Sequence, residues 1–220
     1  MLSSMSQPVK GRTDAGRRRE LRARDTRRRI VEAGLRLFLE HGYVDTTVQG
    51  IAQAAGVAPA TVYQAFGTKH AVLAAALDMT VAGDDKPLAV LDREWVEAVR
   101  RERNRGRRLR RVVEGASEIA ARTAPLKEIL RDAAATEAAA RDLIREDHER
   151  RHRTQAGLVD LLIENRPLRA GIDRRRAVDT FFALVNSATY ELLVTQRGWT
   201  LAEWQEWLTD VIARDLFGAG

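Results

Sequence analysis

The side chains best suited to recognition chemistry lie in one run, residues 46–69, which reads TTVQGIAQAAGVAPATVYQAFGTK. At helical spacing its outward positions are small or carry one amide or hydroxyl group: Ala58, Pro59, Ala60, Thr61, Gln64 and Ala65. Such a face can reach the floor of a DNA major groove, where a glutamine amide pairs with adenine and an alanine methyl contacts thymine. The run therefore indicates hydrogen-bonding recognition of DNA.

Two helices joined by a tight turn would position this face. The pattern predicts a helix that starts near Thr46, a turn around Gly56 and a second short helix over 59–65. Glycine can adopt the positive φ that a tight turn often needs. A further helix is expected over 68–81.

A helix is also expected ahead of this run. Thr26 can cap its start, apolar residues then recur at helical spacing, and Gly42 stops it. Gly34 lies inside this helix at a cost of up to about 1 kcal/mol relative to alanine. We expect close approach of another helix to be the reason.

Positive charge is concentrated at the N-terminus. Residues 1–29 hold ten basic and three acidic side chains, a net charge of +7, whereas the whole chain carries +6. Residues 1–24 lack apolar periodicity, so we expect a disordered basic arm. Beside a DNA-reading motif such an arm would be attracted to phosphates. The alternative is a solvated tail that contacts nothing.

Composition limits the fold and the function. The 220 residues are rich in Ala, Leu, Arg and Glu, which predicts an all-α protein. The absence of cysteine excludes disulfides and thiolate metal sites. His148 and His152 have a possible zinc-ligand spacing, but the neighbouring arginines oppose a cation, so no metal is expected.

Other classes of protein are also disfavoured. No apolar stretch approaches the roughly 20 residues of a membrane span, and no apolar core follows the basic N-terminus as in a signal peptide. A cytoplasmic location is therefore expected, with no membrane partner. We find no Ser/His/Asp set, phosphate loop or carboxylate pair with a clear pocket, so we expect neither an enzyme nor a cofactor.

The remainder of the chain is predicted to be helical. A composition break at 83–87 is followed by helical stretches over 88–103, 107–123, 126–135, 137–165, 173–197 and 201–217. The segment 104–106, Pro125 and Thr136 separate the first four stretches, and 166–171 forms a loop. Thr200 and Glu203 make a capping box for the last helix.

The last two helices are too apolar to be covered by one core, which favours a four-helix bundle formed with a second chain. The candidate interface residues are Phe181, Val185, Leu192, Trp204, Trp207, Leu208 and Val211. The alternative is a monomer that buries these side chains internally.

Residues 26–79 resemble the DNA-binding domain of the TetR family of bacterial transcription regulators. Order, spacing and residue type agree over a pattern that comprises Ile30, Ala33, Leu37, Phe38, Gly42, Thr46, Thr47, Val48, Ile51, Ala52, Ala55, Gly56, Val57, Thr61, Val62, Tyr63, Phe66, Lys69 and Leu73. The resemblance implies an N-terminal three-helix helix-turn-helix DNA-binding domain over 25–82. It also implies a larger C-terminal helical domain for ligand binding and dimerisation over 83–220.

The resemblance also implies roles for individual residues. Base contacts fall on Gln49, Pro59, Ala60, Gln64 and Ala65. Phosphate contacts fall on Thr47, Thr61, Tyr63 and Lys69, to which the basic segment adds Arg27 and Arg28. Ala58 stands where relatives often have serine, so the reading helix lacks a side-chain cap.

A ligand pocket is implied among the middle helices. Candidate lining residues are Trp95, His148, Arg151, Gln155, Asn186 and Tyr190. His148, Arg151 and Gln155 belong to a helically spaced row between Ile144 and Leu162. Its polar middle either lines a cavity or faces solvent, and the sequence does not decide between the two.

These features together predict a homodimeric, sequence-specific regulator of transcription. We expect a repressor that binds a palindromic operator in double-stranded DNA and is released by a small-molecule effector. The alternative is a sequence-tolerant, nucleoid-type DNA-binding protein that uses its arginine-rich arm. The sequence indicates neither the effector nor the operator.

Overall fold

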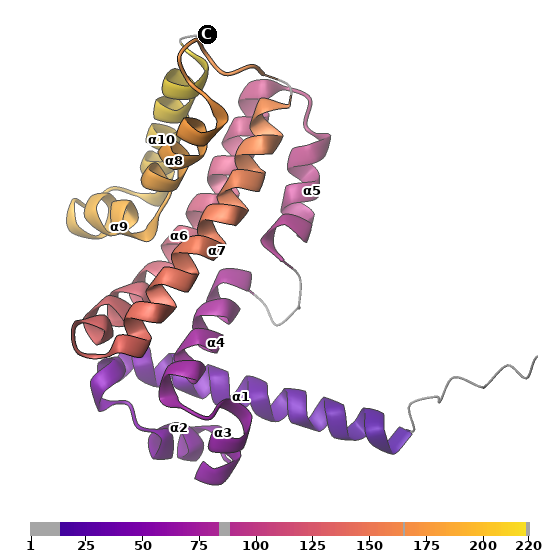
Figure 1. Ribbon diagram of the computed structural model, residues 1–220, viewed down its shortest axis with the longest axis vertical. Helices are drawn as coiled ribbons and strands as arrows, with labels where there is room; N and C mark the ends of the chain where they lie inside the picture. Colours follow the sequence, from indigo (N-terminus) through magenta and orange to yellow (C-terminus); the bar gives the residue numbers. More distant parts are fainter. Residues whose placement is uncertain (1–13, 84–88, 165, 219–220) are drawn as a thin grey trace, which may run out of the picture.

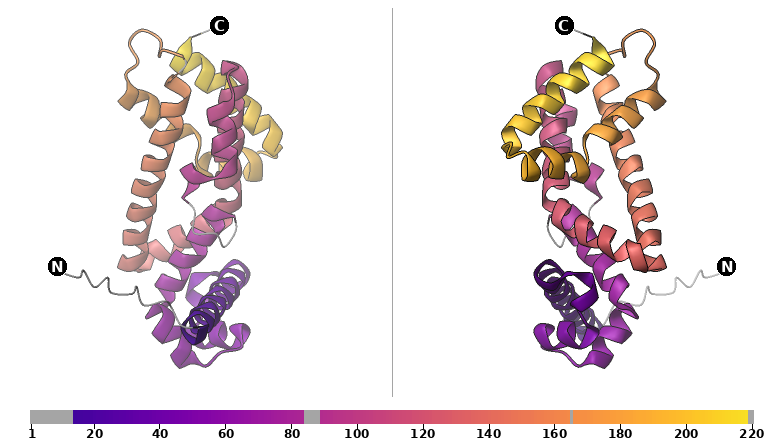
Figure 2. Two further views of the ribbon diagram at one scale, coloured as in Figure 1. Left: turned by 90° about the vertical axis from the view of Figure 1, so that its right-hand side faces the viewer. Right: turned by 90° about the vertical axis from the view of Figure 1, so that its left-hand side faces the viewer.

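A computed structural model of the protein describes residues 14–83, 89–164 and 166–218, and these residues form helices and no strands. The all-α prediction is therefore confirmed. The molecule is elongated, with α1 to α3 at one end, α8 to α10 at the other, and the long helices α6 and α7 between them (Figures 1 and 2). No helix in the described part is both long and apolar enough to cross a bilayer.

The N-terminal end contains α1 (Asp14–Asp45), α2 (Val48–Ala55), α3 (Pro59–Phe66) and α4 (Lys69–Ala82). The starts and ends of α2, α3 and α4 lie close to those predicted. Thr47 and Thr68 cap α2 and α4, their side chains accepting hydrogen bonds from the N–H groups of Gly50 and Ala71. Local caps and turns thus decide where these helices begin.

The start predicted for α1 is wrong. The helix begins at Asp14 rather than near Thr26, so the part of the predicted disordered arm over 14–24 is helical. Arginine, alanine, leucine and glutamate all favour helix, and Asp14–Arg17 adds an ion pair of 2.9 Å one turn apart. The rest of that arm, 1–13, lies outside the described residues. Gly42, with φ of 73°, interrupts the helical backbone as predicted.

The C-terminal region begins with a 3₁₀ turn (Val90–Asp92) and α5 (Glu94–Arg101) in place of the single helix predicted over 88–103. Next come α6 (Arg105–Thr136) and α7 (Ala138–Ile163). The predicted break at Pro125 is wrong, because α6 runs through it. Ala124 and Leu126 are both buried, so packing on either side of the proline holds the helix together despite the lost N–H.

The helix predicted over 173–197 is also broken. It consists of α8 (Arg174–Leu184), α9 (Ser187–Tyr190) and a π-helical turn at Glu191–Gln196. Asn186 causes the break, since its side-chain oxygen accepts from the N–H groups of Ala188 and Thr189 at 2.7 and 3.0 Å and so starts a new helix. The last helix, α10 (Leu201–Phe217), has the predicted capping box of Thr200 and Glu203.

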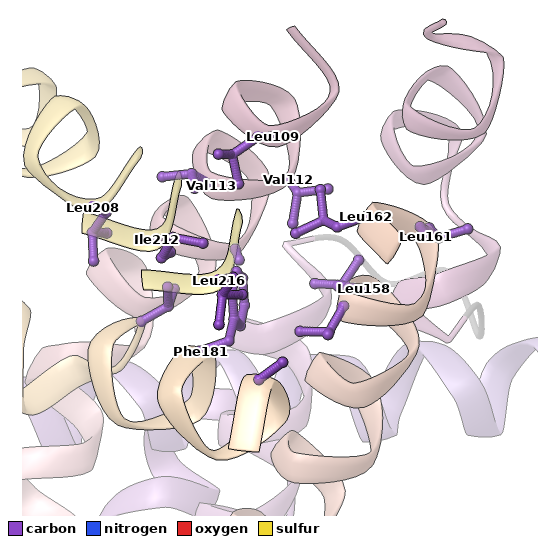
Figure 3. Packing of buried hydrophobic residues seen from close by; sticks show 14 of the residues in the cluster. Leu109, Val112, Val113, Leu158, Leu161, Leu162, Phe181, Leu208, Ile212 and Leu216 are labelled. Atoms are coloured by element: carbon purple, nitrogen blue, oxygen red, sulfur yellow. The ribbon is translucent and has the colours of Figure 1, made fainter. Parts of the chain in front are cut away.

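Two hydrophobic cores hold the molecule together. The upper one joins α5, α6, α7, α8 and α10 around side chains such as Val112, Leu158, Phe181 and Leu208, which Figure 3 shows close together. The lower core contains the helix-turn-helix but also Leu126 and Leu143, from α6 and α7. The N-terminal helices are therefore packed directly onto the ends of the long helices.

Candidate nucleic-acid interface

The tight turn between α2 and α3 has the backbone that its glycine was predicted to supply. Gly56 adopts φ 64° and ψ 41°, the left-handed region. Its N–H donates to the carbonyl of Gln53 at 3.1 Å, and the next N–H, of Val57, donates to Ala52 at 3.0 Å. These bonds close the end of α2 and send the chain directly into α3.

Two arginines of α1 hold the ends of both helices. Arg27 Nη1 donates to the carbonyl of Ala65 at 2.7 Å, and its guanidinium lies 3.9 Å from the centre of the Phe66 ring. Arg29 Nη1 donates to the carbonyl of Ala55 at 3.1 Å. A cation at a helix C-terminus satisfies free carbonyls and interacts favourably with the helix dipole. Helix α1 thereby fixes both α2 and α3.

Arg28 has different partners. It forms ion pairs with Asp25 at 3.0 Å and Glu32 at 2.9 Å along α1. These neighbours raise the pKa of Arg28, the hydrogen bond to Asp25 contributing most. The two arginines predicted to contact phosphate, Arg27 and Arg28, thus both have partners inside the protein. Sequence reasoning missed Arg29, because the carbonyl that it binds lies 26 residues away and leaves no local signal.

The predicted base-contacting residues lie largely on one open surface. Gln49 of α2 and Pro59, Ala60 and Gln64 of α3 are exposed. Ala65 is only partly exposed and packs against the lower core. Val62, one turn earlier on the same buried side of α3, is 1% exposed and anchors the helix in that core. The helix therefore presents a small, weakly polar face.

The predicted phosphate-contacting residues differ in exposure and in the contacts that they already make inside the protein. Tyr63 is 50% exposed, Thr61 is partly buried, and Thr47 is exposed but caps α2 with its hydroxyl. Lys69 Nζ donates to the carbonyl of Tyr43 at 2.7 Å and lies 4.0 Å from the centre of the Tyr43 aromatic ring. Burial lowers the pKa of Lys69. The Lys69 ammonium thus links the start of α4 to the C-terminal end of α1.

Small residues let the supporting helices approach each other. A Cβ added to Gly34 would lie 2.6 Å from Val72 Cγ1, so α1 and α4 cross too closely there for a side chain. The explanation predicted for this glycine is confirmed. As predicted, Ala58 provides no side-chain cap for α3.

The arrangement has a counterpart among known sequences. The family model for bacterial regulatory proteins of the tetR family matches residues 30–76, which run from the middle of α1 into α4. Residues 30–76 thus match the DNA-binding domain of that family. The family resemblance carried by the pattern from Ile30 to Leu73 thus corresponds to one contiguous, packed unit.

Similarity to a curated TetR-type protein is confined to part of the chain. The uncharacterized HTH-type transcriptional regulator TtgW of Pseudomonas putida is 39% identical over 80 residues. This match covers 35% of the chain and 59% of that relative, so the chain spans less than two thirds of its length.

Solved structures share the fold over most of the chain. FadR from Bacillus subtilis in complex with stearoyl-CoA has a TM-score of 0.66 at 18% identity, covering 88% of this chain and 99% of FadR. A regulator from Saccharomonospora viridis in complex with choline gives 0.62 at 21%, covering 86% and 96%. NalD, the secondary repressor of the MexAB-OprM multidrug efflux pump in Pseudomonas aeruginosa, gives 0.62 at 22%, covering 87% and 95%.

A cavity of about 400 Å³ lies between α4, α6, α7 and the break that follows α8. Of the six residues predicted to line a pocket, Arg151, Gln155 and Asn186 do so. Within the row from Ile144 to Leu162, it is Arg151, Gln155 and Leu158 that line it.

The other three predicted lining residues lie elsewhere. The Trp95 ring packs against Gly115, where an added Cβ would come within 2.5 Å of it. His148 and Tyr190 make edge contacts with other aromatic rings, those of Phe182 and Trp204 respectively. None of these three lines the cavity, because Trp95 and Tyr190 pack against other side chains and His148 lies on an exposed part of α7.

The residues predicted at a dimer interface divide into two groups. Phe181, Val185, Trp204 and Leu208 are at most 1% exposed within a single chain, so they belong to its own core and not to a contact surface. Packing within the single chain explains this correction, because α8 and α10 bury their apolar faces together with α6 in the upper core. Leu192 is 50% exposed, and Trp207 and Val211 are partly exposed.

Proposed function

We propose that this chain is a TetR-type, sequence-specific DNA-binding regulator of transcription, and that α3 enters the major groove. The observation that supports it best is the exposed face formed by Pro59, Ala60 and Gln64, on a helix anchored by Val62. A small-residue face approaches base edges closely, and the Gln64 amide can pair with adenine. Tyr63, Thr61, Thr47 and Lys69 would contribute phosphate contacts that set the register.

The exposed basic helix of α1 would add sequence-independent attraction. Arg17, Arg18, Arg19, Arg22 and Arg24 are all exposed over its first turns, which extend beyond the helix-turn-helix (Figure 1). Lysine and arginine near phosphates release counterions, so this contribution weakens steeply with salt. Arg27 and Arg28 act mainly through their contacts inside the protein.

The functional unit in this proposal is a homodimer. Two copies would place their reading helices about 34 Å apart, on successive turns of the duplex, and so address a palindrome. Apolar side chains at the far end of the molecule are the candidates for the contact: Leu192, which is exposed, and Trp207 and Val211, which are partly exposed. Their position leaves α3 free in both copies.

The proposal includes repression that a small-molecule effector relieves. Asp78, Val81 and Ala82 of α4 line the cavity, while Val72 and Leu73 of the same helix belong to the lower core. A ligand that binds one orientation of α4 better than another would shift the population between DNA-bound and released forms. The stearoyl-CoA complex of FadR and the description of NalD as a repressor are consistent with this role.

DNA fragments selected from a random pool by the full-length protein would test the proposal in gel-shift titrations. We expect the selected site to be an inverted repeat, bound about a thousandfold or more tightly than random DNA. We also expect affinity to fall as salt rises. Equal affinity for selected and random DNA would instead favour a sequence-tolerant, nucleoid-type protein, and the absence of any shift would exclude both.

A further inference from the structure

The cavity contains a row of polar side chains on one face of α7. Asp147, Arg151 and Gln155 follow each other at intervals of four residues. The same cavity has an apolar lining formed by Val81, Ala82, Val90, Leu91, Ile119 and Leu158. A site of this kind suits a molecule with one polar end and one hydrocarbon part.

The charges of this row do not cancel. Lys127 Nζ lies 2.9 Å from Asp147 Oδ2, and both side chains are largely buried. At the cavity's edge Arg150 forms an ion pair with Asp78 at 2.7 Å. The carboxylates of Asp147 and Asp78 are thus each already paired with a cation. Neither of them is left to pair with Arg151 alone, so the enclosed set of Lys127, Asp147 and Arg151 carries one excess positive charge.

Arg151 is held in place by neutral groups. Its Nη1 donates to the carbonyls of Phe182 and Val185 at 3.2 and 3.3 Å, and its guanidinium lies 3.7 Å from the centre of the Phe182 ring. Its Nε is buried and has no hydrogen-bond partner among the described residues. A buried guanidinium N–H without a partner is costly, so this atom is a ready donor to an anion.

Gln155 presents a matching acceptor. The side chain is 5% exposed, and its Nε2 donates to the carbonyl of Val185 at 2.8 Å. That bond fixes the orientation of the amide, because a carbonyl requires a donor. Its Oε1 is buried and lacks a partner within the described parts of the chain. The two unsatisfied atoms, one donor and one acceptor, lie on successive turns of α7.

We propose that the cavity binds an amphipathic organic acid whose carboxylate pairs with Arg151 and whose hydrocarbon chain fills the apolar end. A hydroxyl close to the carboxylate donates to Gln155 Oε1. The acid neutralises the excess charge and satisfies both unpartnered atoms, which neither a hydrocarbon nor a cation does. This inference rests on the proposed function, since it names the class of effector for the same regulator.

Four probes with a ten-carbon chain separate charge from hydrophobicity: decanoate, 3-hydroxydecanoate, decan-1-ol and decyltrimethylammonium. Binding to the full-length protein is measured by calorimetry below the micelle concentration of each probe. We expect decanoate to bind about tenfold or more tightly than the alcohol, because a charge-assisted hydrogen bond in a dry site is strong. An alcohol or ammonium probe that binds as tightly as decanoate, or a lack of decanoate binding, overturns the proposal.

Variants test the two side chains. Arg151→Met should weaken decanoate binding about tenfold and leave the alcohol unaffected, and Arg151→Lys should restore part of the loss. Arg145→Gln, at an exposed arginine of the same helix that does not line the cavity, should change neither. Gln155→Leu should remove the advantage of 3-hydroxydecanoate over decanoate. Equal losses for acid and alcohol in Arg151→Met overturn the charge pairing. If Arg151→Met fails to fold, the probe series on the unaltered protein still decides.

The gel shift on selected DNA is run in parallel without any probe. A protein that binds its site but prefers the ammonium probe refutes the ligand class and leaves the proposed function intact. A protein that binds decanoate but no DNA refutes the proposed function alone. The two inferences therefore fail in distinguishable ways.

Discussion

Arg27 Nη1 lies 2.7 Å from the carbonyl oxygen of Ala65, one residue before the end of α3. The first helix therefore holds the candidate reading helix by its C-terminus. Because Ala58 leaves the N-terminus of α3 without a side-chain cap, this contact is a principal restraint on how α3 is oriented.

Replacing Arg27 by methionine should loosen α3. The change removes a charged hydrogen bond to a helix end and the stacking on Phe66, so we expect a loss of about 1–2 kcal/mol in unfolding free energy, measured by urea denaturation. DNA affinity should fall similarly for all sites. Arg24→Met, at an exposed position of the same helix, should leave stability unchanged; an equal loss there would contradict this role for Arg27.

Adding a methyl group at Gly34 should be destabilising. The new Cβ would lie 2.6 Å from Val72 Cγ1, so we expect Gly34→Ala to cost about 1–3 kcal/mol despite alanine's higher helix propensity. Combining it with Val72→Ala should recover part of that loss in a double-mutant cycle. Gly106→Ala, where the nearest atom is 3.5 Å away, serves as the control and should not destabilise. Additive effects in the cycle would show that the two helices do not meet there.

Stability at high pH should depend on Tyr43. Burial, followed by the nearby Glu137 carboxylate, raises the pKa of this phenol. The phenol of the unfolded chain ionises near pH 10, whereas the folded one stays neutral, so stability is constant below about pH 10 and is lost as pH rises above it. We expect Tyr43→Phe to show a shallower loss of unfolding free energy between about pH 9.5 and 11. Identical alkaline profiles would mean that Tyr43 titrates normally.

A charge at Leu192 should disrupt the dimer. Its side chain is 50% exposed and apolar, so Leu192→Glu would bury an unpaired carboxylate in the contact. We expect sedimentation equilibrium to give twice the chain mass for the unaltered protein and the mass of one chain for the variant. Leu39→Glu, at a side chain that is 48% exposed on α1, is the control. If only the control became monomeric, the interface would lie on α1.

The helix-turn-helix was predictable because local signals define it. Thr47 and Thr68 cap their helices, Gly56 supplies the left-handed turn, and the apolar spacing marks the buried face. Features that depend on distant contacts were not predictable. The continuity of α6 through Pro125 follows from burial on both sides of it.

The same distinction applies to the candidate sites. The outward face of α3 follows from helical periodicity, whereas the capping by Arg27 and Arg29 bridges 38 and 26 residues. In the cavity, the four-residue spacing placed Arg151 and Gln155 together. No local pattern showed that Trp95 would be used to pack against Gly115.

The central claim is that α3 reads DNA sequence, and matched variants at Gln64 and Tyr63 test it most directly. Dissociation constants are measured for the selected site and for every single-base-pair change in it. We predict that Gln64→Ala loses about 1–3 kcal/mol of discrimination at one base pair in each half-site, while Tyr63→Ala weakens all sites by a similar factor. Uniform weakening by both variants, or unchanged discrimination in Gln64→Ala, would contradict the account.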